Sequence, residues 1–88
     1  MVDMNYVYVL RSLKDGKSYI GSTTDLRRRI KEHADGDVVS TRPRRPLKLV
    51  YYEAYVDEQD ARERESSLKL KSNAYAQLRK RIRRSLGI

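Results

Sequence analysis

The 88-residue chain carries a cation and an imidazole one turn apart on one predicted helical face. Arg29 and His33, the only histidine, are four residues apart. Leu26 and Ile30 fall on the same face at the 3.6-residue period, which predicts that this face turns inward. Because burying charged and polar groups costs free energy, Arg29 and His33 at these positions indicate a site that uses them.

Two predicted strands bring tyrosines toward the same place. Asn5–Arg11 reads as an apolar and aromatic strand, and Lys17–Ser22 reads as its return after the turn signal Lys14–Lys17. Ordinary packing within a sheet is the alternative explanation for the two tyrosines. With an even-numbered loop, one face should carry Tyr8, Leu10, Tyr19 and Gly21, and the other Val7, Val9 and Ile20.

The first helix is predicted over Thr24–Asp35. Thr23 or Thr24 should cap it, Asp25 should lie in its first turn, and Gly36 should follow its end. Residues 37–46 contain both prolines of the chain and should form a loop without helix. The arginines of this loop should stay in solvent, where they are either simply hydrated or placed to bind phosphate.

A third strand is predicted over Leu47–Ala54, with alternation placing Leu47, Leu49, Tyr51 and Glu53 on one face. Asp57 should cap a further helix on which Ala61, Glu65 and Leu68 share a face. A surface glutamate paired with Lys69 is the alternative explanation for Glu65. A last helix is predicted over residues 74–86, with an apolar stripe of Ala74, Leu78, Ile82 and Leu86.

The composition limits the kind of protein. All seven aromatic residues are tyrosine, and the absence of cysteine excludes disulfides, thiolate zinc sites and a cysteine nucleophile. Neither a signal peptide nor an apolar run of membrane length is present. We therefore expect a single domain over residues 1–88, cytoplasmic and monomeric, with no obligate protein partner and no membrane contact.

Charge points to a polyanionic partner. The chain has 20 Lys and Arg against 12 Asp and Glu, a net charge of +8, and residues 72–88 contain no acidic side chain. A basic tail and a basic loop on a small domain favour nucleic acid, with solubility alone as the alternative. The expected nucleic-acid contacts are Arg42, Arg44, Arg45, Arg79, Lys80, Arg81, Arg83 and Arg84.

These features in this order resemble the GIY-YIG nuclease domain. Tyr6-Val7-Tyr8 takes the place of the Gly-Ile-Tyr signature, and Tyr19-Ile20-Gly21 is the intact second signature. Arg29 and His33 match the arginine and histidine that the family carries four residues apart.

The resemblance extends along most of the chain. The segment D-A-R-E-R-E-S-S-L-K resembles the helix with the family's glutamate and places it at Glu65. The segment R-P-L-K-L-V-Y-Y-E is similar to small stand-alone bacterial members, and the resemblance covers residues 5–71.

The resemblance implies an α+β fold, a three-stranded antiparallel sheet flanked by helices. It also implies hydrolysis of DNA phosphodiester bonds with one divalent metal, Mg²⁺ or alternatively Mn²⁺. Glu65 would hold the metal, and Arg29 would stabilise the transition-state charge. Tyr8 would accept or relay a proton from the attacking water, with Tyr19 and His33 assisting.

One metal agrees with the residues available. A two-metal site needs several convergent carboxylates, and the sequence offers Glu65 with Glu53 as a distant second. We expect the Tyr8 and Tyr19 hydroxyls, the Arg29 guanidinium and the Glu65 carboxylate to line one concave surface. Two other hypotheses are a module that binds nucleic acid without cutting it and a structural or protein-interaction domain.

Overall fold

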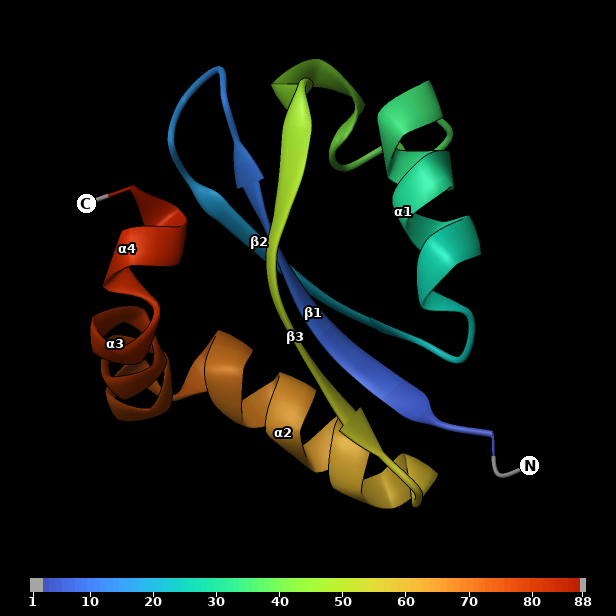
Figure 1. The fold of residues 1–88 in the computed structure, drawn as a ribbon, viewed down its shortest axis with the longest axis vertical. Coiled ribbons are helices and arrows are strands. Elements are labelled where there is room, and N and C mark those ends of the chain that lie inside the picture. The colour runs from blue at the N-terminus through green and yellow to red at the C-terminus, as the bar shows by residue number, and fades with distance from the viewer. Residues whose placement is uncertain (1–2, 88) are drawn as a thin grey trace.

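A three-stranded antiparallel sheet with helices on both faces forms the protein (Figure 1). The computed structural model describes residues 3–87, so residues 1, 2 and 88 of the expected domain lie outside it. The predicted fold class is confirmed. No helix within residues 3–87 is long and apolar enough to cross a membrane. The elements in chain order are β1 (Asn5–Ser12), β2 (Ser18–Thr23), α1 (Leu26–Asp35), the 3₁₀ helix η1 (Arg42–Arg44), β3 (Leu47–Tyr55), α2 (Glu58–Leu70), α3 (Ser72–Arg81) and α4 (Arg83–Leu86).

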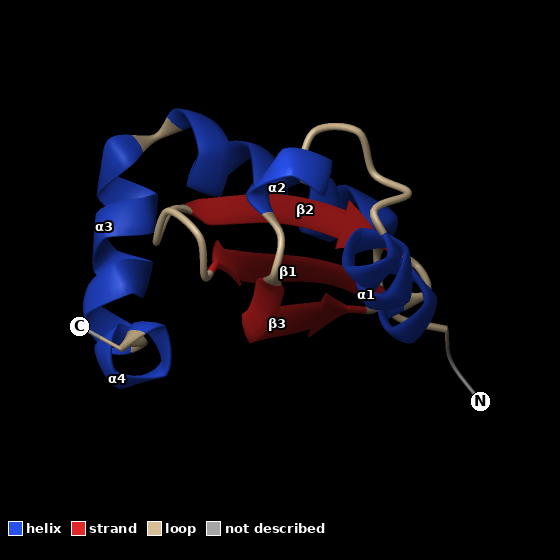
Figure 2. Ribbon diagram, turned by 90° about the horizontal axis from the view of Figure 1, so that it is seen from above, coloured by secondary structure: helices blue, strands red, loops and turns tan. Residues whose placement is uncertain are grey.

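Strand β1 lies in the middle of the sheet, between β2 and β3. Helix α1 covers one face, and α2, α3 and α4 cover the other (Figure 1). Figure 2 shows that α3 and α4 lie at the end of the sheet where β2 begins. The main core packs one face of β1 against the C-terminal helices and consists of Val7, Val9, Ala61, Leu68, Leu78, Ile82 and Leu86.

The register of the β1–β2 hairpin confirms the predicted faces. Tyr8 lies opposite Gly21 and Leu10 opposite Tyr19 on the side of α1, whereas Val9 lies opposite Ile20 on the core side. The hairpin turn uses Gly16 at a φ of 74°, a conformation that glycine adopts at little cost.

The predicted face of the third strand is wrong because β3 contains a bulge. Val9 pairs with Tyr51, but the next residue of β1, Leu10, pairs with Leu49, which leaves Val50 as an extra residue. One extra residue reverses the alternation. Leu47 and Leu49 therefore lie on the α1 side, whereas Tyr51 and Glu53 lie on the core side with Val9 and Val7.

The start of α1 also differs from the prediction. Asp25 has non-helical backbone angles, φ −132° and ψ 89°, and its carboxylate accepts a hydrogen bond from the Arg28 N–H at 3.1 Å, so Asp25 caps a helix that begins at Leu26. The end at Gly36, with a φ of 82°, is as predicted. The loop of residues 37–46 is not free of helix, because η1 forms one turn whose early Pro43 needs no N–H partner.

The last predicted helix is divided in two. The backbone at Ile82, with φ −107° and ψ 23°, leaves the α conformation and separates α3 from α4. The predicted apolar stripe is nevertheless buried at Leu78, Ile82 and Leu86, with Ala74 packed against it. Asp57 caps α2 by accepting bonds from the Gln59 and Asp60 N–H groups, as expected.

An ion pair between Glu53 and Arg64 links β3 to α2 on the core side of the sheet. The Glu53 carboxylate accepts hydrogen bonds from the Nε and Nη2 of Arg64 at 3.0–3.1 Å, from the Tyr51 hydroxyl at 2.7 Å and from the Tyr55 hydroxyl. Burial raises the pKa of Glu53, but Arg64 and the two hydroxyls outweigh it and bring the pKa below the ordinary value. Burial, and then the hydrogen bond to Glu53, raise the pKa of Tyr55 to about 12.

Replacing Glu53 by glutamine should lower the free energy of unfolding by about 1–3 kcal/mol, since Arg64 loses its hydrogen-bonded anion. The carboxyl has a lowered pKa in the folded state, so its contribution is complete above the ordinary value of 4.5 and is lost as the pH falls through the folded pKa. Urea unfolding at neutral pH and at decreasing pH measures both effects. The control is Glu63→Gln at an exposed position of α2, and equal stability of the two variants would contradict the role of Glu53.

Candidate active site

A buried chain of hydrogen bonds joins β1, α1 and the loop that follows α1. The Tyr8 hydroxyl lies 2.8 Å from His33 Nε2, and His33 Nδ1 lies 2.8 Å from Thr41 Oγ1. None of the three side chains is more than 1% exposed. Every buried side-chain polar atom of the described residues has a partner, so this network is fully satisfied.

The network favours neutral side chains. Burial, and then the nearby Arg29 cation, lower the pKa of His33, so the imidazole is uncharged at neutral pH. Burial also raises the pKa of Tyr8, although the Arg29 guanidinium beside it opposes this rise. With the ring proton on Nδ1, His33 donates to Thr41 and accepts from Tyr8, and this tautomer leaves Nε2 able to take the Tyr8 proton.

Gly21 makes room for the Tyr8 hydroxyl. A Cβ placed on Gly21 would lie 2.5 Å from Tyr8 Oη and 2.6 Å from Cζ. The glycine of the second signature is thus needed here for close approach, because any side chain would push the tyrosine away from His33. The space over Gly21 is filled by the Tyr8 ring and hydroxyl.

Arg29 and Tyr19 border this network. Arg29 donates to Glu32 at 3.1 Å one turn further along α1, and this ion pair is about one-third exposed on each side. The Tyr19 ring lies edge-on to His33 with 5.2 Å between ring centroids and 6.5 Å from the Tyr8 ring. Tyr19 is half-buried, so it is the more accessible of the two predicted tyrosines.

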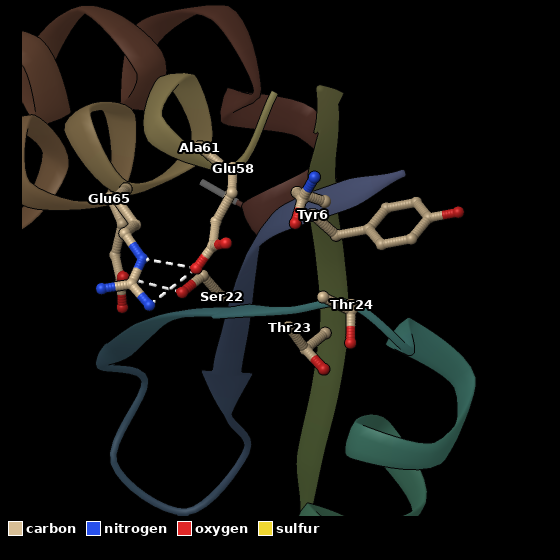
Figure 3. Close-up of a pocket in the computed structure, with 9 residues that line it drawn as sticks. Tyr6, Ser22, Thr23, Thr24, Glu58, Ala61 and Glu65 are labelled. Carbon is tan, nitrogen blue, oxygen red and sulfur yellow. Dashed lines mark hydrogen bonds and ion pairs between the residues drawn. The ribbon is translucent and has the colours of Figure 1, made fainter. Parts of the chain in front are cut away.

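Glu65 reaches the edge of β2 from the opposite layer. Figure 3 shows Glu65 and Glu58 pointing from α2 toward Ser22 of β2, while the Tyr6 ring points away from them. The Ser22 hydroxyl donates to Glu65 Oε1 at 2.8 Å, and the Lys69 ammonium lies 2.8 Å from Oε2. The sequence left two alternatives for Glu65, an inward position on the helix or a surface ion pair with Lys69. In the structure Glu65 faces β2 and also pairs with Lys69.

The Glu65 carboxylate is ionised at neutral pH. Burial raises its pKa, but the hydrogen bonds from Lys69 and Ser22 and the charge of Lys69 outweigh burial, and the pKa lies below the ordinary value. The side chain is 20% exposed, so it is open enough for exchange of its partners. Because this ionised carboxylate already binds the Lys69 ammonium group, its surroundings favour a bound cation.

The donors around Glu65 fit a single hydrated divalent cation. Glu65 lines a cleft of about 370 Å³ together with the hydroxyl-bearing Ser22, Thr23 and Thr24, all hard oxygen donors (Figure 3). Mg²⁺ usually keeps several waters and binds through one or two carboxylates. Residues 3–87 contain no group of three or more His, Asp and Glu side chains that could hold a metal, so any metal there would keep most of its waters.

The four groups expected on one concave surface do not line one hollow. The cleft of Glu65 lies on one side of β2, and its lining includes neither predicted tyrosine and not Arg29. Tyr19 lines a separate hollow between β2 and α3. Glu65 is nevertheless bonded to Ser22, and the Tyr8 hydroxyl lies against the adjacent Gly21, so the two sets of groups lie at neighbouring residues of β2.

The predicted basic residues divide into two groups. The loop arginines are partly used by the fold: Arg42 donates to the Gly36 carbonyl at 2.7 Å, Arg44 to the Ser18 carbonyl, and Arg45 to the Arg42 carbonyl. Arg42 and Arg45 are exposed as expected, whereas Arg44 is half-buried and lies 3.5 Å from Asp15. Among the C-terminal cations, four line a hollow of their own around α4: Lys80, Arg81, Arg83 and Arg84.

Three residues of the site escaped sequence reasoning. Glu32 lies three residues after Arg29, and helical spacing alone could have found this ion pair. Ser22 directly follows the second signature, but nothing in the pattern pairs it with Glu65. Thr41 lies in the proline-containing loop, where no periodicity indicates which way a side chain faces.

Comparison with known proteins gives a consistent set of relatives. Residues 4–82 match the GIY-YIG catalytic domain family. A UPF0213 protein of Clostridium perfringens is 45% identical over 67 residues, which are 75% of this chain and 71% of the relative. A UPF0213 protein of Halobacterium salinarum is 40% identical over 72 residues, 81% of this chain and 92% of the relative. The solution structure of a UPF0213 protein from Bacillus halodurans has a TM-score of 0.54 and 42% identity, covering 85% of this chain and 81% of that one.

Thr41→Val should lower the free energy of unfolding by about 1–3 kcal/mol, because a buried ring nitrogen of His33 loses its partner while the volume is kept. Thr41→Ser keeps the hydroxyl and should recover most of this loss. Urea unfolding measures the difference between the two variants. If valine and serine were equally tolerated, Thr41 would not be holding the imidazole.

Stability should also fall on mild acidification because of His33. Its pKa is lowered in the folded state, so below the ordinary value of 6.5 the unfolded chain takes up a proton that the folded chain resists. The free energy of unfolding should therefore decrease as the pH falls below about 6.5 and level off below the folded pKa. His33→Gln should remove this part of the pH dependence, and an identical slope in the variant would show that other groups cause it.

Proposed function

The chain belongs to the GIY-YIG catalytic domain family, and from this membership we propose that it is a metal-dependent endonuclease acting on phosphodiester bonds of DNA. One observation carries the proposal. The Glu65 carboxylate is bonded to Ser22, and the Tyr8 hydroxyl, with His33 and Arg29 beside it, lies against the adjacent residue Gly21, so both sets of groups lie at neighbouring residues of β2. Phosphodiester hydrolysis needs an activated water, a cation-binding anion and charge stabilisation, and each has a candidate here.

Arg29 is proposed to bind the scissile phosphate. Its guanidinium matches phosphate oxygens, and charge-assisted hydrogen bonds to them strengthen as negative charge develops. Glu32 holds the side chain beside Tyr8 and is one-third exposed, so the pair can open toward a bound phosphate. Glu32 is thus a positioning residue for Arg29.

Tyr8 and His33 are proposed to carry the proton of the attacking water. With a raised pKa, Tyr8 is a poor base by itself, but it can pass its own proton to His33 Nε2 as it receives one. The water oxygen then forms the new bond to phosphorus while the bond to the leaving oxygen breaks. Thr41 holds the imidazole in position through its hydrogen bond to Nδ1, and the half-buried Tyr19 assists next to the ring.

Glu65 is proposed as the protein ligand of a divalent cation, Mg²⁺ or alternatively Mn²⁺. When bound, such an ion supplies charge stabilisation to phosphate oxygens and lowers the pKa of water. Ser22 orients the carboxylate through its 2.8 Å hydrogen bond. Lys69, which holds Glu65 in this structure, would exchange with the cation.

General electrostatic attraction of the substrate is proposed for the predicted basic residues of the loop and the C-terminal helices. These are Arg42, Arg44, Arg45, Arg79, Lys80, Arg81, Arg83 and Arg84. A module that binds nucleic acid with these cations and does not cut it is the competing function. The two are separated by cleavage in the presence of Mg²⁺ with an EDTA control, tested on single-stranded, duplex and branched DNA and on RNA.

Glu65→Gln should reduce cleavage by orders of magnitude while DNA binding without metal is kept or strengthened, since a repulsive charge has been removed. Arg29→Ala should reduce the cleavage rate about 10²–10³-fold, the usual effect of losing one preorganised donor. Rates at saturating DNA and metal, with circular dichroism to verify folding, measure both effects. Arg27→Ala, exposed on the same helix, is the control. A folded Glu65→Gln protein that cuts at the parent rate would support the non-catalytic binding module.

A further inference from the structure

A groove between β2 and α3 lies next to the site and carries only positive charge. It has a volume of about 580 Å³, with Tyr19 in its lining and Lys17, Lys69 and Arg79 among its cationic residues. None of the described residues that line it is acidic. Lys17 and Lys69 were not among the residues predicted to contact nucleic acid. We call this hollow the β2–α3 groove.

Two of these cations are available to a ligand. Lys17 and Arg79 are exposed and form no ion pair with the described part of the chain. Lys69 is different, because it holds Glu65 at 2.8 Å while also lining the groove. The groove therefore extends from Tyr19, and from the lysine that holds Glu65, to two cations that form no ion pair within residues 3–87.

The walls of the groove are held together by a side-chain hydrogen bond. The Tyr75 hydroxyl of α3 donates to Ser18 Oγ of β2 at 2.7 Å, although the two residues are 57 positions apart. Arg79 follows Tyr75 by one helical turn, so both side chains lie on the face of α3 that lines the groove. Figure 2 shows this helix beside the start of β2. The cations are thus presented on a preformed surface.

The other C-terminal cations lie elsewhere. Lys80 and Arg83 line the hollow around α4, together with Arg81 and Arg84, and no candidate catalytic residue is among the lining of that hollow. The basic tail is therefore divided: Arg79 lines the groove that reaches Tyr19, and its neighbours do not. The β2–α3 groove differs from a basic surface that is only hydrated because its lining includes Tyr19, a candidate catalytic residue.

We propose that the β2–α3 groove binds the phosphate backbone of the substrate strand next to the scissile phosphate, through Lys17 and Arg79. This inference rests on the proposed nuclease function, whose substrate path it defines. Lysine and arginine contacts to phosphates position a strand without reading its sequence. The larger cluster around α4 contributes general attraction and no defined phosphate contact.

The test compares two double variants that remove the same charge. Lys17→Gln/Arg79→Gln alters the groove, and Lys80→Gln/Arg83→Gln alters the α4 cluster. Binding of single-stranded and duplex DNA of one sequence is measured by fluorescence anisotropy in EDTA over a range of salt. Each lost phosphate contact should reduce the slope of log K against log salt by about 0.7–0.9, so the groove variant should lose about 1.4–1.8 and the control variant much less.

Cleavage gives an independent measurement. The groove variant should show a raised KM with kcat near the parent value, because Lys17 and Arg79 do not touch the reacting groups. Equal salt slopes and KM values for the two double variants would overturn the proposal. So would displacement of DNA by polyglutamate at equal charge concentration, which would indicate an acidic polypeptide as the partner.

Failure of the groove and failure of the nuclease function give different results. If Glu65→Gln abolishes cleavage but the groove variant binds and cuts like the parent, the groove proposal is wrong and the nuclease function stands. If no substrate is cut but the groove variant alone loses DNA binding, the nuclease function is wrong and the groove remains a nucleic-acid site.

Discussion

The contact between the Tyr8 hydroxyl, Gly21 and His33 is the constraint on which the rest of the site depends. The Tyr8 phenol packs against the backbone of Gly21, which has no side chain, and His33 of α1 hydrogen-bonds to the phenol hydroxyl. Because His33 is also fixed by Thr41, this contact ties the middle strand, an edge strand, the first helix and the following loop into one unit. Arg29 is placed beside Tyr8 by the same helix, so the orientation of the guanidinium follows from the packing of the imidazole.

Around this contact the protein separates neutral and charged groups. Tyr8 and His33 are buried on the α1 side and stay uncharged, which avoids the free-energy cost of burying ions. Glu65 and Lys69 lie on the α2 side, where the hydrogen bonds from Lys69 and Ser22 lower the pKa of Glu65 and keep its carboxylate ionised. The neutral groups of the α1 side and the charged groups of the α2 side both lie at β2, which is an edge strand of the sheet. The same edge strand borders the β2–α3 groove.

Sequence periodicity predicted the side-chain faces correctly wherever a strand or helix kept one period along its whole length. The faces of the β1–β2 hairpin followed from alternation and loop parity, and the shared face of Arg29 and His33 followed from the helical period. The rule failed at β3, where Val50 is an extra residue and reverses the faces of Leu49 and Tyr51. A bulge of this kind depends on pairing with β1, and nothing within the segment itself marks it.

The sequence by itself determined the elements, the fold class, the family and the identity of the candidate catalytic side chains. The elements follow from periodicity and spacing, which are properties of short segments, whereas the family and the catalytic roles were implied by the resemblance of the ordered motifs to the GIY-YIG domain. The tertiary structure decided which partner each side chain has and therefore its charge state. Glu65 bonds to Ser22 across 43 positions, and His33 bonds to Tyr8 across 25. Desolvation and hydrogen bonding depend on neighbours brought together only by packing, so no local pattern could show that the imidazole is neutral, that Glu65 holds Lys69, or that Arg44 is used by the fold.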